Sequence, residues 1–367
     1  MTALRHKLQE LAALPADRPM CMPGAFYTSQ AQFEHEARTV LRHGWHCLGR
    51  EDELPEPGDF FTVRLLQEPL LLVRGNDQSI RALANVCRHR GMPLAEGRGN
   101  AKRFICSYHA WTYDRDGALL RAPRMENAGF DAKQCRLPEH NIQLWNGFIY
   151  VNLNPKAAPF VHPELDAMLA PYEPNNFRLV HVAEEQWKTN WKCLVENFME
   201  GYHLSVVHPQ TLHEYTPTGL ARKLVHGEGF TSYGANYPAT TAARGEGAPK
   251  LGDDERRRSS LFAKFPTQVA SQAASLLVSL SIFPLDSGTI TVKWTMSVYK
   301  EDLADETILQ RIALWEKVNR EDREKLERLQ LALASEYAVE GPLASDDFEG
   351  TIRDFQVWLA REDRAVD

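Results

Sequence analysis

The sequence of 367 residues contains no long apolar run and no extended block of one charge. Its most apolar stretch, residues 269–283, is interrupted by serine and glutamine and is shorter than the roughly 20 apolar residues that span a bilayer. The N-terminal segment mixes charged and apolar residues, so it lacks the apolar centre of a secretion signal. The net charge is −7 and the longest basic run is three arginines at 256–258, which gives no support to a nucleic acid partner. We therefore predict a cytoplasmic protein without a membrane segment.

Cysteine is also scarce, with six in the whole chain. A disulfide framework is not expected in a chain of this length with so few cysteines, and free thiols agree with a reducing compartment. The sequence further lacks the glycine-rich fingerprint of flavin and dinucleotide sites, so we expect no such cofactor in this chain. Four of the cysteines are expected to be inert packing residues: Cys21, Cys47, Cys135 and Cys193.

The chain is longer than one average domain, so we predict two. In the first half, short apolar or β-branched segments are bounded by glycine, proline, asparagine or aspartate, which predicts a small all-β domain. These segments are residues 60–66, 69–74, 80–86, 103–106 and 148–153.

The second half predicts helices and strands that are segregated along the chain rather than alternating, which is the pattern of an α+β fold. Helices are predicted over residues 189–207, 305–335 and 346–361, and strands over 275–283 and 289–299. Residues 221–255 are rich in glycine, serine, threonine and proline, and we interpret them as a long loop.

Two short segments combine cysteine with histidine. One residue separates Cys87 from His89, two separate Cys106 from His109, and sixteen lie between the pairs. Two thiolates on one iron and two imidazoles on the other form a Rieske [2Fe–2S] cluster. A tetrahedral zinc ion is the alternative, but zinc sites with two cysteines and two histidines usually group like ligands on each arm, whereas each arm here carries one of each type. We therefore predict a Rieske cluster bound by these four residues.

Two further histidines, His203 and His208, lie near the end of the helix predicted over 189–207. Two histidines and one carboxylate form the facial triad of non-haem Fe(II), which leaves positions open for O₂. On an ideal helix these two side chains point about 140° apart, so both can reach one metal only if the helix breaks or bulges. Pro209 favours such a break, because a residue before proline avoids helical geometry.

The third ligand is expected on the helix predicted over 305–335. Apolar residues recur there in steps of three and four and define one buried stripe, with Asp322 in its middle. A carboxylate on a buried face is costly unless it is paired or binds a metal, whereas Glu321 and Glu324 lie off the stripe and are expected to be merely solvated. We predict Asp322 as the ligand; an aspartate paired with an arginine or a backbone group is the alternative.

The motifs CRHRG at 87–91, CSYHAWTY at 106–113 and NWKCLVENFMEGYHLSVVHP at 190–209 resemble those of the catalytic α-subunit of Rieske non-haem iron oxygenases. The resemblance covers nearly the whole chain. It implies an α+β chain with an N-terminal all-β Rieske domain and a C-terminal helix-grip-like catalytic domain that has an antiparallel sheet and long helices. The expected boundaries are 1–44 for a helical lead-in that packs on the catalytic domain, 45–155 for the Rieske domain and 156–367 for the catalytic domain.

The resemblance also implies an assembly and further site residues. In this family head-to-tail trimers place each cluster beside the neighbour's iron, and an acidic residue bridges a cluster histidine of one subunit to an iron histidine of the next. Glu200 occupies the bridging position and Asn197 matches an asparagine near the iron. Many ring-hydroxylating members have aspartate as the bridge. Glutamate resembles the branch that oxidises quaternary ammonium compounds, the carnitine, choline and glycine betaine monooxygenases.

We therefore predict the terminal oxygenase component of a multicomponent enzyme that hydroxylates a small molecule with O₂. Electrons from NAD(P)H are expected to arrive through a separate reductase with flavin or iron–sulfur groups and to pass from the cluster by way of His109 and Glu200 to the mononuclear Fe(II). Hydroxylation beside nitrogen would yield a dealkylated amine and an aldehyde, and an aromatic cage would hold such a cation. The candidate walls of that cage are Tyr202, Tyr215, Tyr233, Tyr237, Phe283 and Trp294.

Two alternatives stay open at this point. In the first alternative, the chain is an oxygenase of an aromatic or other carboxylate, and Arg222 or Lys223 binds the anion. In the second it is a Rieske electron-transfer protein fused to a ligand-binding domain, which leaves Asp322 and the paired histidines unexplained.

Overall fold

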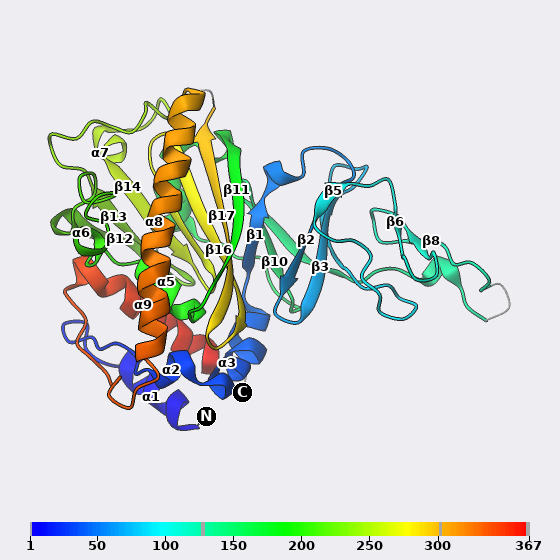
Figure 1. The fold of residues 1–367 in the computed structure, drawn as a ribbon, viewed down its shortest axis with the longest axis horizontal. Helices are drawn as coiled ribbons and strands as arrows, with labels where there is room; N and C mark the ends of the chain where they lie inside the picture. The colour runs from blue at the N-terminus through cyan, green and yellow to red at the C-terminus, as the bar shows by residue number, and fades with distance from the viewer. Residues whose placement is uncertain (1, 126–128, 301–302, 365–367) are drawn as a thin grey trace. The chain divides into compact units, whose positions relative to one another are not determined.

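The structure is a computed structural model that describes residues 2–125, 129–300 and 303–364 (Figure 1). The chain forms two compact units, one made of Met1–His46 with Phe160–Asp367 and the other of Cys47–Pro159. The predicted divisions after residues 44 and 155 lie close to these bounds. The N-terminal helical segment thus belongs to the same unit as the second half of the chain.

The smaller unit is built from β-sheets, because its short apolar segments alternate with tight turns. A seven-stranded sheet has the order β1-β10-β9-β4-β3-β2-β5, and a three-stranded sheet has the order β6-β7-β8. The all-β prediction for this part of the chain is confirmed. The elements are β1 (His46–Arg50), η2 (Glu51–Glu53), β2 (Asp59–Leu65), β3 (Glu68–Arg74), β4 (Ile80–Ala84), β5 (Arg98–Asn100), β6 (Phe104–Ile105), β7 (Thr112–Tyr113), β8 (Leu119–Arg121), η3 (Ala132–Gln134), β9 (Glu139–Trp145) and β10 (Phe148–Asn152).

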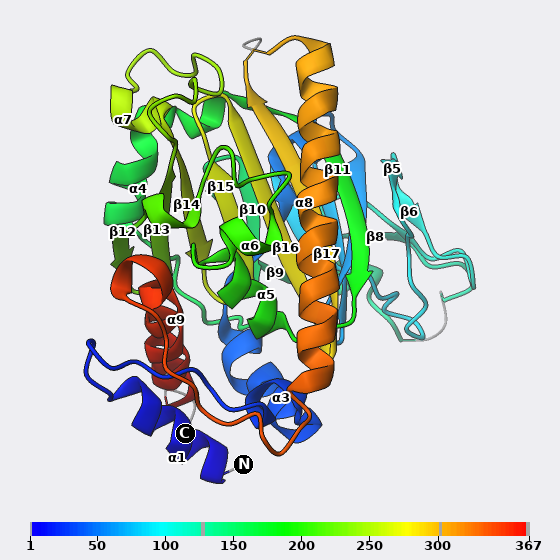
Figure 2. The same cartoon turned by 60° about the vertical axis from the view of Figure 1, so that its left-hand side comes forward.

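The larger unit contains one seven-stranded antiparallel sheet in the order β11-β17-β16-β15-β14-β13-β12. The long helix α8 (Asp305–Ala332) lies along this sheet beside β11 in both views (Figures 1 and 2). The α+β prediction is therefore confirmed. The strands are β11 (Phe177–Trp187), β12 (Ala221–Gly227), β13 (Phe230–Asn236), β14 (Arg258–Lys264), β15 (Gln268–Gln272), β16 (Leu276–Asp286) and β17 (Thr289–Tyr299).

The other helices of the larger unit are shorter. The first and last helices, α1 and α9, contact each other, so the two ends of this unit meet. The helices are α1 (Thr2–Ala12), α2 (Ala25–Thr28), α3 (Gln30–Glu36), the π-helix η1 (Ala37–Leu41), α4 (Pro163–Leu169), η4 (Ala170–Tyr172), η5 (Pro174–Asn176), α5 (Trp191–Phe198), α6 (Leu204–Val207), η6 (Thr218–Leu220), α7 (Asp253–Arg256) and α9 (Asp346–Arg364).

Two sequence predictions for this unit are wrong. The expected loop over 221–255 contains the paired strands β12 and β13, because the small residues of β13 fit a sheet position that is buried on both faces. The single helix expected over 189–207 is two helices, α5 and α6, separated by residues 199–203. That break determines where the two candidate iron histidines lie.

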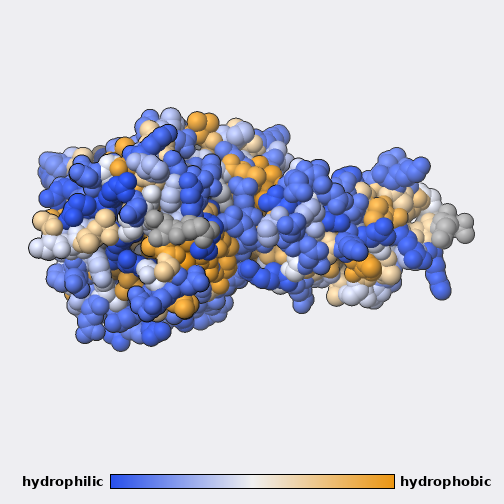
Figure 3. Space-filling model, turned by 90° about the horizontal axis from the view of Figure 1, so that it is seen from above, coloured by the Kyte–Doolittle hydropathy of each residue, from blue (hydrophilic) through white to orange (hydrophobic). Residues whose placement is uncertain are grey.

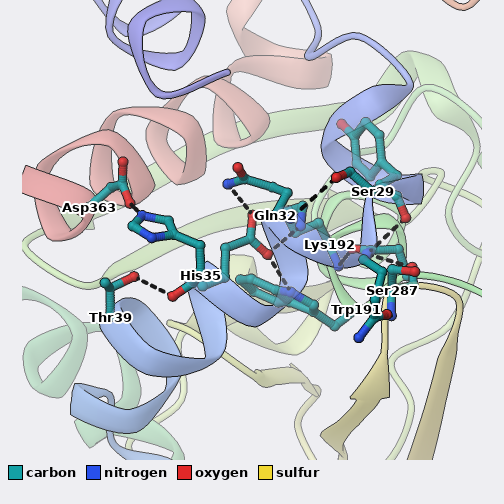
Figure 4. A network of polar contacts seen from close by, with 12 residues as sticks. Ser29, Gln32, His35, Thr39, Trp191, Lys192, Ser287 and Asp363 are labelled. Atoms are coloured by element: carbon teal, nitrogen blue, oxygen red, sulfur yellow. Dashed lines mark hydrogen bonds and ion pairs between the residues drawn. The ribbon is translucent and has the colours of Figure 1, made fainter. Parts of the chain in front are cut away.

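A buried charge pair joins the N-terminal segment to the rest of the larger unit. Lys192 Nζ of α5 lies 2.6 Å from Glu36 Oε2 of α3, and both side chains are at most 1% exposed. The same carboxylate accepts hydrogen bonds from Trp191 Nε1 at 3.2 Å and from Gln32 Nε2 at 3.1 Å. Figure 4 shows this network around Lys192 and Trp191. Because the carboxylate is fully bonded, its burial is tolerated.

None of the helices in the described part of the chain is long and apolar enough to cross a membrane. On the face seen in Figure 3, hydrophilic residues cover most of the surface and hydrophobic residues form separate patches.

The buried pair yields a stability prediction. Lys192→Met removes the cation and leaves the Glu36 carboxylate buried and uncompensated, so we expect the unfolding free energy of the larger unit to fall by about 3–5 kcal/mol. Urea unfolding followed by tryptophan fluorescence measures the loss, with cluster absorption as a separate report on the smaller unit. The control is Arg361→Met, which removes a pair with Glu228 at 3.3 Å that is exposed on both sides and is expected to cost less than about 1 kcal/mol. Equal losses in the two variants would contradict the role given to Lys192.

Candidate metal centres

The two cysteine–histidine segments of the smaller unit fold into loops with the same hydrogen-bond frame. In the first, Cys87 N donates to Met92 O at 2.8 Å and Gly91 N donates to Cys87 O at 3.0 Å. In the second, Cys106 N donates to Trp111 O at 2.8 Å and Ala110 N donates to Cys106 O at 3.0 Å. The fourth residue after each cysteine has a positive φ, +78° at Gly91 and +55° at Ala110. The two loops therefore share one backbone frame, although the histidine is the second residue after the cysteine in the first loop and the third in the second.

The ligand atoms of these loops are divided between the interior and the surface. Both thiols are buried, and Cys87 Sγ lies 3.4 Å from the hydroxyl of Tyr113. The imidazoles of His89 and His109 face each other with 3.1 Å between their Nδ1 atoms. Trp111 is buried and stacks on His89 with ring centroids 5.0 Å apart. Two buried sulfur ligands and two outer imidazoles fit a cluster that has a different pair of ligands on each iron.

A single zinc ion fits this arrangement poorly. Four ligands around one tetrahedral zinc lie within about 4 Å of one another, given bond lengths near 2.0–2.3 Å. Among the described residues, the ligand atoms of only one group of three or more His, Cys, Asp or Glu residues lie within 4.8 Å of one another, and that group lies in the other unit. The four Cys and His ligands are thus spread more widely than one zinc ion would need.

The second centre forms where α5 and α6 separate. His203 is the N-cap of α6 and His208 is its C-cap, so the two histidines stand at either end of a four-residue helix. The backbone of His208 is no longer helical, with φ −115° and ψ 47°, as expected for a residue that precedes a proline. Asp322 projects from the buried stripe of α8, which contains Ile308, Trp315, Asn319 and Leu326. The three side chains meet with their ligand atoms within 4.8 Å of one another.

The orientation of these three side chains fits a metal better than a hydrogen-bonded group. Asp322 Oδ1 lies 3.1 Å from His208 Nε2 and 3.7 Å from His203 Nε2. Both Asp322 Oδ1 and His208 Nε2 are buried without a hydrogen-bond partner among the described residues. Lone pairs that converge on one point in a buried site fit a non-haem iron with two histidines and one carboxylate.

Carboxylates hold both histidines from behind. Glu200 contacts His203 Nδ1 through Oε1 and accepts the backbone N–H of His203 at 3.1 Å through Oε2. Glu321 Oε2 lies 2.8 Å from His208 Nδ1 and also accepts the hydroxyl of Thr211 at 2.6 Å. An imidazole whose Nδ1–H is donated to a carboxylate presents Nε2 to a metal.

The prediction that Glu321 is merely solvated is wrong, because its carboxylate contacts His208 and Thr211. It lies off the buried stripe of α8, but the chain after α6 runs past that side of the helix and places His208 against it. The general tendency of ligating histidines to donate to an acid would have made a carboxylate next to Asp322 a candidate. Which of the neighbouring acids contacts which histidine depends on the path of the chain after α6.

Opposite charges within the site stabilise the charged forms of its histidine and carboxylate side chains, which burial alone would disfavour. Burial opposes a charge on His203, but the carboxylates of Glu200 and Asp322 outweigh it and raise the pKa of this imidazole. Burial likewise opposes a charge on Asp322, but His208 and His203 lower the pKa of this carboxyl, and the amide of Asn197 acts in the same direction. The acids and histidines of this site thus each favour the charged form of their neighbours, against the effect of burial.

The residues expected to form an aromatic cage are not gathered in one place. Tyr202 is 58% exposed, and the hydroxyl of Tyr233 donates to the backbone oxygen of Glu200 at 3.2 Å. The rings of Tyr215 and Tyr237 hold the guanidinium of Arg244, whose central carbon lies 4.0 and 5.7 Å from their centroids. Phe283 and Trp294 are buried in the sheet, and Trp294 contacts the ring of His181.

The expected anion anchors are engaged elsewhere. Lys223 Nζ pairs with Asp354 at 3.0 Å and with Asp346 at 3.1 Å, and Arg222 Nε lies 3.9 Å from Asp347. These contacts join β12 to the first half of α9, so both cations already lie near carboxylates of this chain.

Two family models match the chain, one for each unit. The Rieske [2Fe-2S] domain matches residues 44–141, and the catalytic domain of the ring hydroxylating alpha subunit matches residues 158–362. The carnitine monooxygenase oxygenase subunit of Escherichia coli (strain K12) is 30% identical over 292 residues, which cover 78% of this chain and 76% of that protein. The glycine betaine monooxygenase oxygenase subunit of Chromohalobacter salexigens is 28% identical, with 92% and 85% covered.

A solved structure agrees with these matches. The quaternary ammonium Rieske monooxygenase CntA in complex with L-carnitine superposes with a TM-score of 0.80 at 25% identity, and the match covers 96% of this chain and 98% of that one. The predicted resemblance is confirmed, and with it an oxygenase that combines a Rieske [2Fe–2S] cluster with non-haem iron. The chain belongs to the family of ring-hydroxylating oxygenase alpha subunits.

Proposed function

We propose that the chain is the oxygenase subunit of a monooxygenase that hydroxylates a quaternary ammonium or N-methyl compound at a carbon bonded to nitrogen. The observation that supports this most directly is the meeting of His203, His208 and Asp322, in a chain whose similar proteins act on carnitine and glycine betaine. At this meeting point His208 Nε2 and Asp322 Oδ1 have no hydrogen-bond partner among the described residues. Hydroxylation at that carbon gives a product that splits into an amine and an aldehyde. The aromatic-carboxylate alternative loses support, because its anchors Arg222 and Lys223 are paired with carboxylates of this chain.

Each centre is assigned to named side chains. Cys87, Cys106, His89 and His109 hold the cluster, and His203, His208 and Asp322 hold Fe(II), which when bound supplies the O₂ chemistry. Glu200 and Glu321 keep the Nδ1–H of each histidine engaged, so that Nε2 faces the metal position. Asn197 lies close enough to Asp322 for its amide to favour the ionised carboxylate, so we assign it to the support of that ligand.

The assembly we propose is a homotrimer that receives electrons from a separate reductase in the cytoplasm. Inter-subunit electron transfer is described for CntA. Glu200 suits the same role here, because its carboxylate already contacts His203 and is 8% exposed. We assign it as the residue that connects His109 of a neighbouring subunit to His203. The free thiols of the chain agree with a reducing compartment.

The assignment of Asp322 is tested by its removal. Asp322→Ala deletes one of three ligands. Loss of an outer hydrogen-bond partner lowers metal affinity roughly 10–100-fold, so we expect the affinity for the mononuclear iron to fall by more than that. The spectrum of the cluster should stay intact. Metal analysis and electron paramagnetic resonance measure the two centres separately. Glu324→Ala, two residues along α8, is the matched control and should keep both. Retention of mononuclear iron by the Asp322 variant would reject the assignment.

Glu321 is tested by the same metal analysis. Glu321→Ala leaves all three ligands but frees the ring of His208, so we expect iron affinity or turnover to fall roughly 10–100-fold. Thr211→Val, which deletes the second contact of that carboxylate, should cost less because the imidazole keeps its acceptor. If the Glu321 variant bound iron and turned over like the unmodified chain, the carboxylate would have no part in orienting His208.

Glu200 is tested by the rate of cluster reoxidation. In Glu200→Gln the carboxylate charge is lost and the shape is kept, so we expect reoxidation of the reduced cluster by O₂ and substrate to slow roughly 10–100-fold, as for loss of a charge-assisted hydrogen bond. The control is Glu196→Gln, which changes an acid that bonds Tyr27 rather than His203. Burial raises the pKa of Glu196 to about 7, so a neutral amide is a mild replacement there. Equal rates in the two variants, at full metal content, would refute the role of Glu200.

A further inference from the structure

Arg244 is a buried cation with no anionic partner among the described residues. It lies in the segment between β13 and α7 and is 6% exposed. Its guanidinium stacks over the ring of Tyr215 at 4.0 Å and approaches the ring of Tyr237 at 5.7 Å. Tyr237 is itself held by a hydrogen bond of its hydroxyl with Ser259 Oγ at 3.0 Å. The two rings restrict the plane of the guanidinium and recover part of its hydration energy.

One edge of this guanidinium has nothing to bind. Nε and Nη2 of Arg244 are both buried and have no hydrogen-bond partner in the described part of the chain. These two nitrogens form the edge that donates two parallel hydrogen bonds to a carboxylate. Buried polar groups are nearly always bonded, and an unpaired buried charge is costlier still. An edge that is held in place and lacks partners has the geometry to bind an anion with two oxygens.

The segment that carries Arg244 is attached to the candidate iron site. Tyr215 belongs to the turns that begin at His208, whose backbone oxygen accepts Thr211 N, Leu212 N and His213 N. Thr241 Oγ1 donates to Glu214 O at 3.4 Å and ties the two segments together. Tyr215 is the seventh residue after His208, about 10 Å along the chain if the turns rise like a helix.

Helix α8 connects the same two places along its buried stripe. Arg311 is near enough to Arg244 for the two charges to interact, and Asp322 lies eleven residues further on, roughly 16 Å along the helix. Between them the stripe presents Trp315 Nε1 and Asn319 Nδ2, which are buried and have no hydrogen-bond partner among the described residues. Unsatisfied donors thus extend from the neighbourhood of Arg244 to that of Asp322.

We propose that Arg244 binds the carboxylate of the substrate through Nε and Nη2, so that the substrate is a quaternary ammonium compound that also carries a carboxylate. This inference rests on the proposed function for the ammonium group. The guanidinium attracts the carboxylate and repels the ammonium, so the ammonium group lies at the end of the substrate away from Arg244. The substrate is therefore oriented with its N-methyl groups toward the candidate iron site. Tyr215 and Tyr237 support the arginine and do not form a cage for the ammonium group.

Binding to the protein with both metal centres and without reductant tests this assignment, since no turnover then occurs. Glycine betaine and choline are matched probes, because both have a trimethylammonium group on two carbons and only the former ends in a carboxylate. L-carnitine is a longer carboxylate, and benzoate is a carboxylate without an ammonium group. Isothermal titration calorimetry gives the affinity of each probe.

We expect glycine betaine or L-carnitine to bind more tightly than choline. In Arg244→Gln the carboxylated probe that the unmodified protein binds should bind about 10- to 100-fold more weakly, as for loss of charge-assisted hydrogen bonds. The affinity for choline should not change. Arg244→Lys keeps the charge without the two-point edge and should recover part of the loss. Arg222→Gln is the control at a cation paired on the surface and should change none of the affinities. If Arg244→Gln does not fold, the order of probe affinities in the unmodified protein and in Arg244→Lys still decides whether Arg244 binds the carboxylate.

The outcomes separate this inference from the proposed function. Binding of choline in preference to both carboxylated cations would overturn the assignment of Arg244 and leave the quaternary ammonium function standing. Binding of benzoate but of no ammonium compound, lost in Arg244→Gln, would uphold Arg244 and overturn the proposed substrate. Unchanged carboxylate affinity in both folded Arg244 variants would overturn the assignment, and the absence of binding by every probe would overturn both.

Discussion

The candidate iron site depends on a break in the chain between α5 and α6. Two histidines five residues apart cannot face one point on a continuous helix. The chain leaves helical geometry after Phe198, makes one short helix from Leu204 to Val207, and leaves it again at His208. Glu200 occupies the break, and its carboxylate accepts the backbone N–H groups of Tyr202 and His203. The residue assigned to electron transfer thus also satisfies the donors that the break exposes.

The larger unit contains several buried charges, and their partners distinguish structure from function. Glu36 and Lys192 satisfy each other and need nothing further. The two histidines are held from behind by Glu200 and Glu321. His208 Nε2 and Asp322 Oδ1 have no hydrogen-bond partner among the described residues, which fits a metal. Arg244 is supported by two rings and has an open edge, which fits a carboxylate. In the last two cases, the atoms without hydrogen-bond partners indicate the kind of ligand that would satisfy them.

The positions of these groups suggest how one protein can oxidise a small, flexible zwitterion at its cationic end. Such a substrate offers little apolar surface for burial, so its two charges are the main means of orienting it. The positive charge of Arg244 supplies a field that holds the carboxylate and directs the ammonium group away from it. The neighbouring arginine, Arg311, strengthens the positive end of that field.

The sequence by itself determined the type of each domain and predicted the candidate metal ligands. Cys87, His89, Cys106 and His109 could be proposed as cluster ligands because short spacing within a β-loop leaves the side chains few directions. Asp322 could be proposed as an iron ligand because helical periodicity places this acid on a buried stripe, which has few explanations. The tertiary structure alone decided that β12 and β13 replace an expected loop, that Glu321 contacts His208, and that the guanidinium of Arg244 occupies the faces of Tyr215 and Tyr237. Each of these results joins segments far apart in the chain or depends on the path between them, and neither local propensity nor spacing specifies which distant surfaces meet.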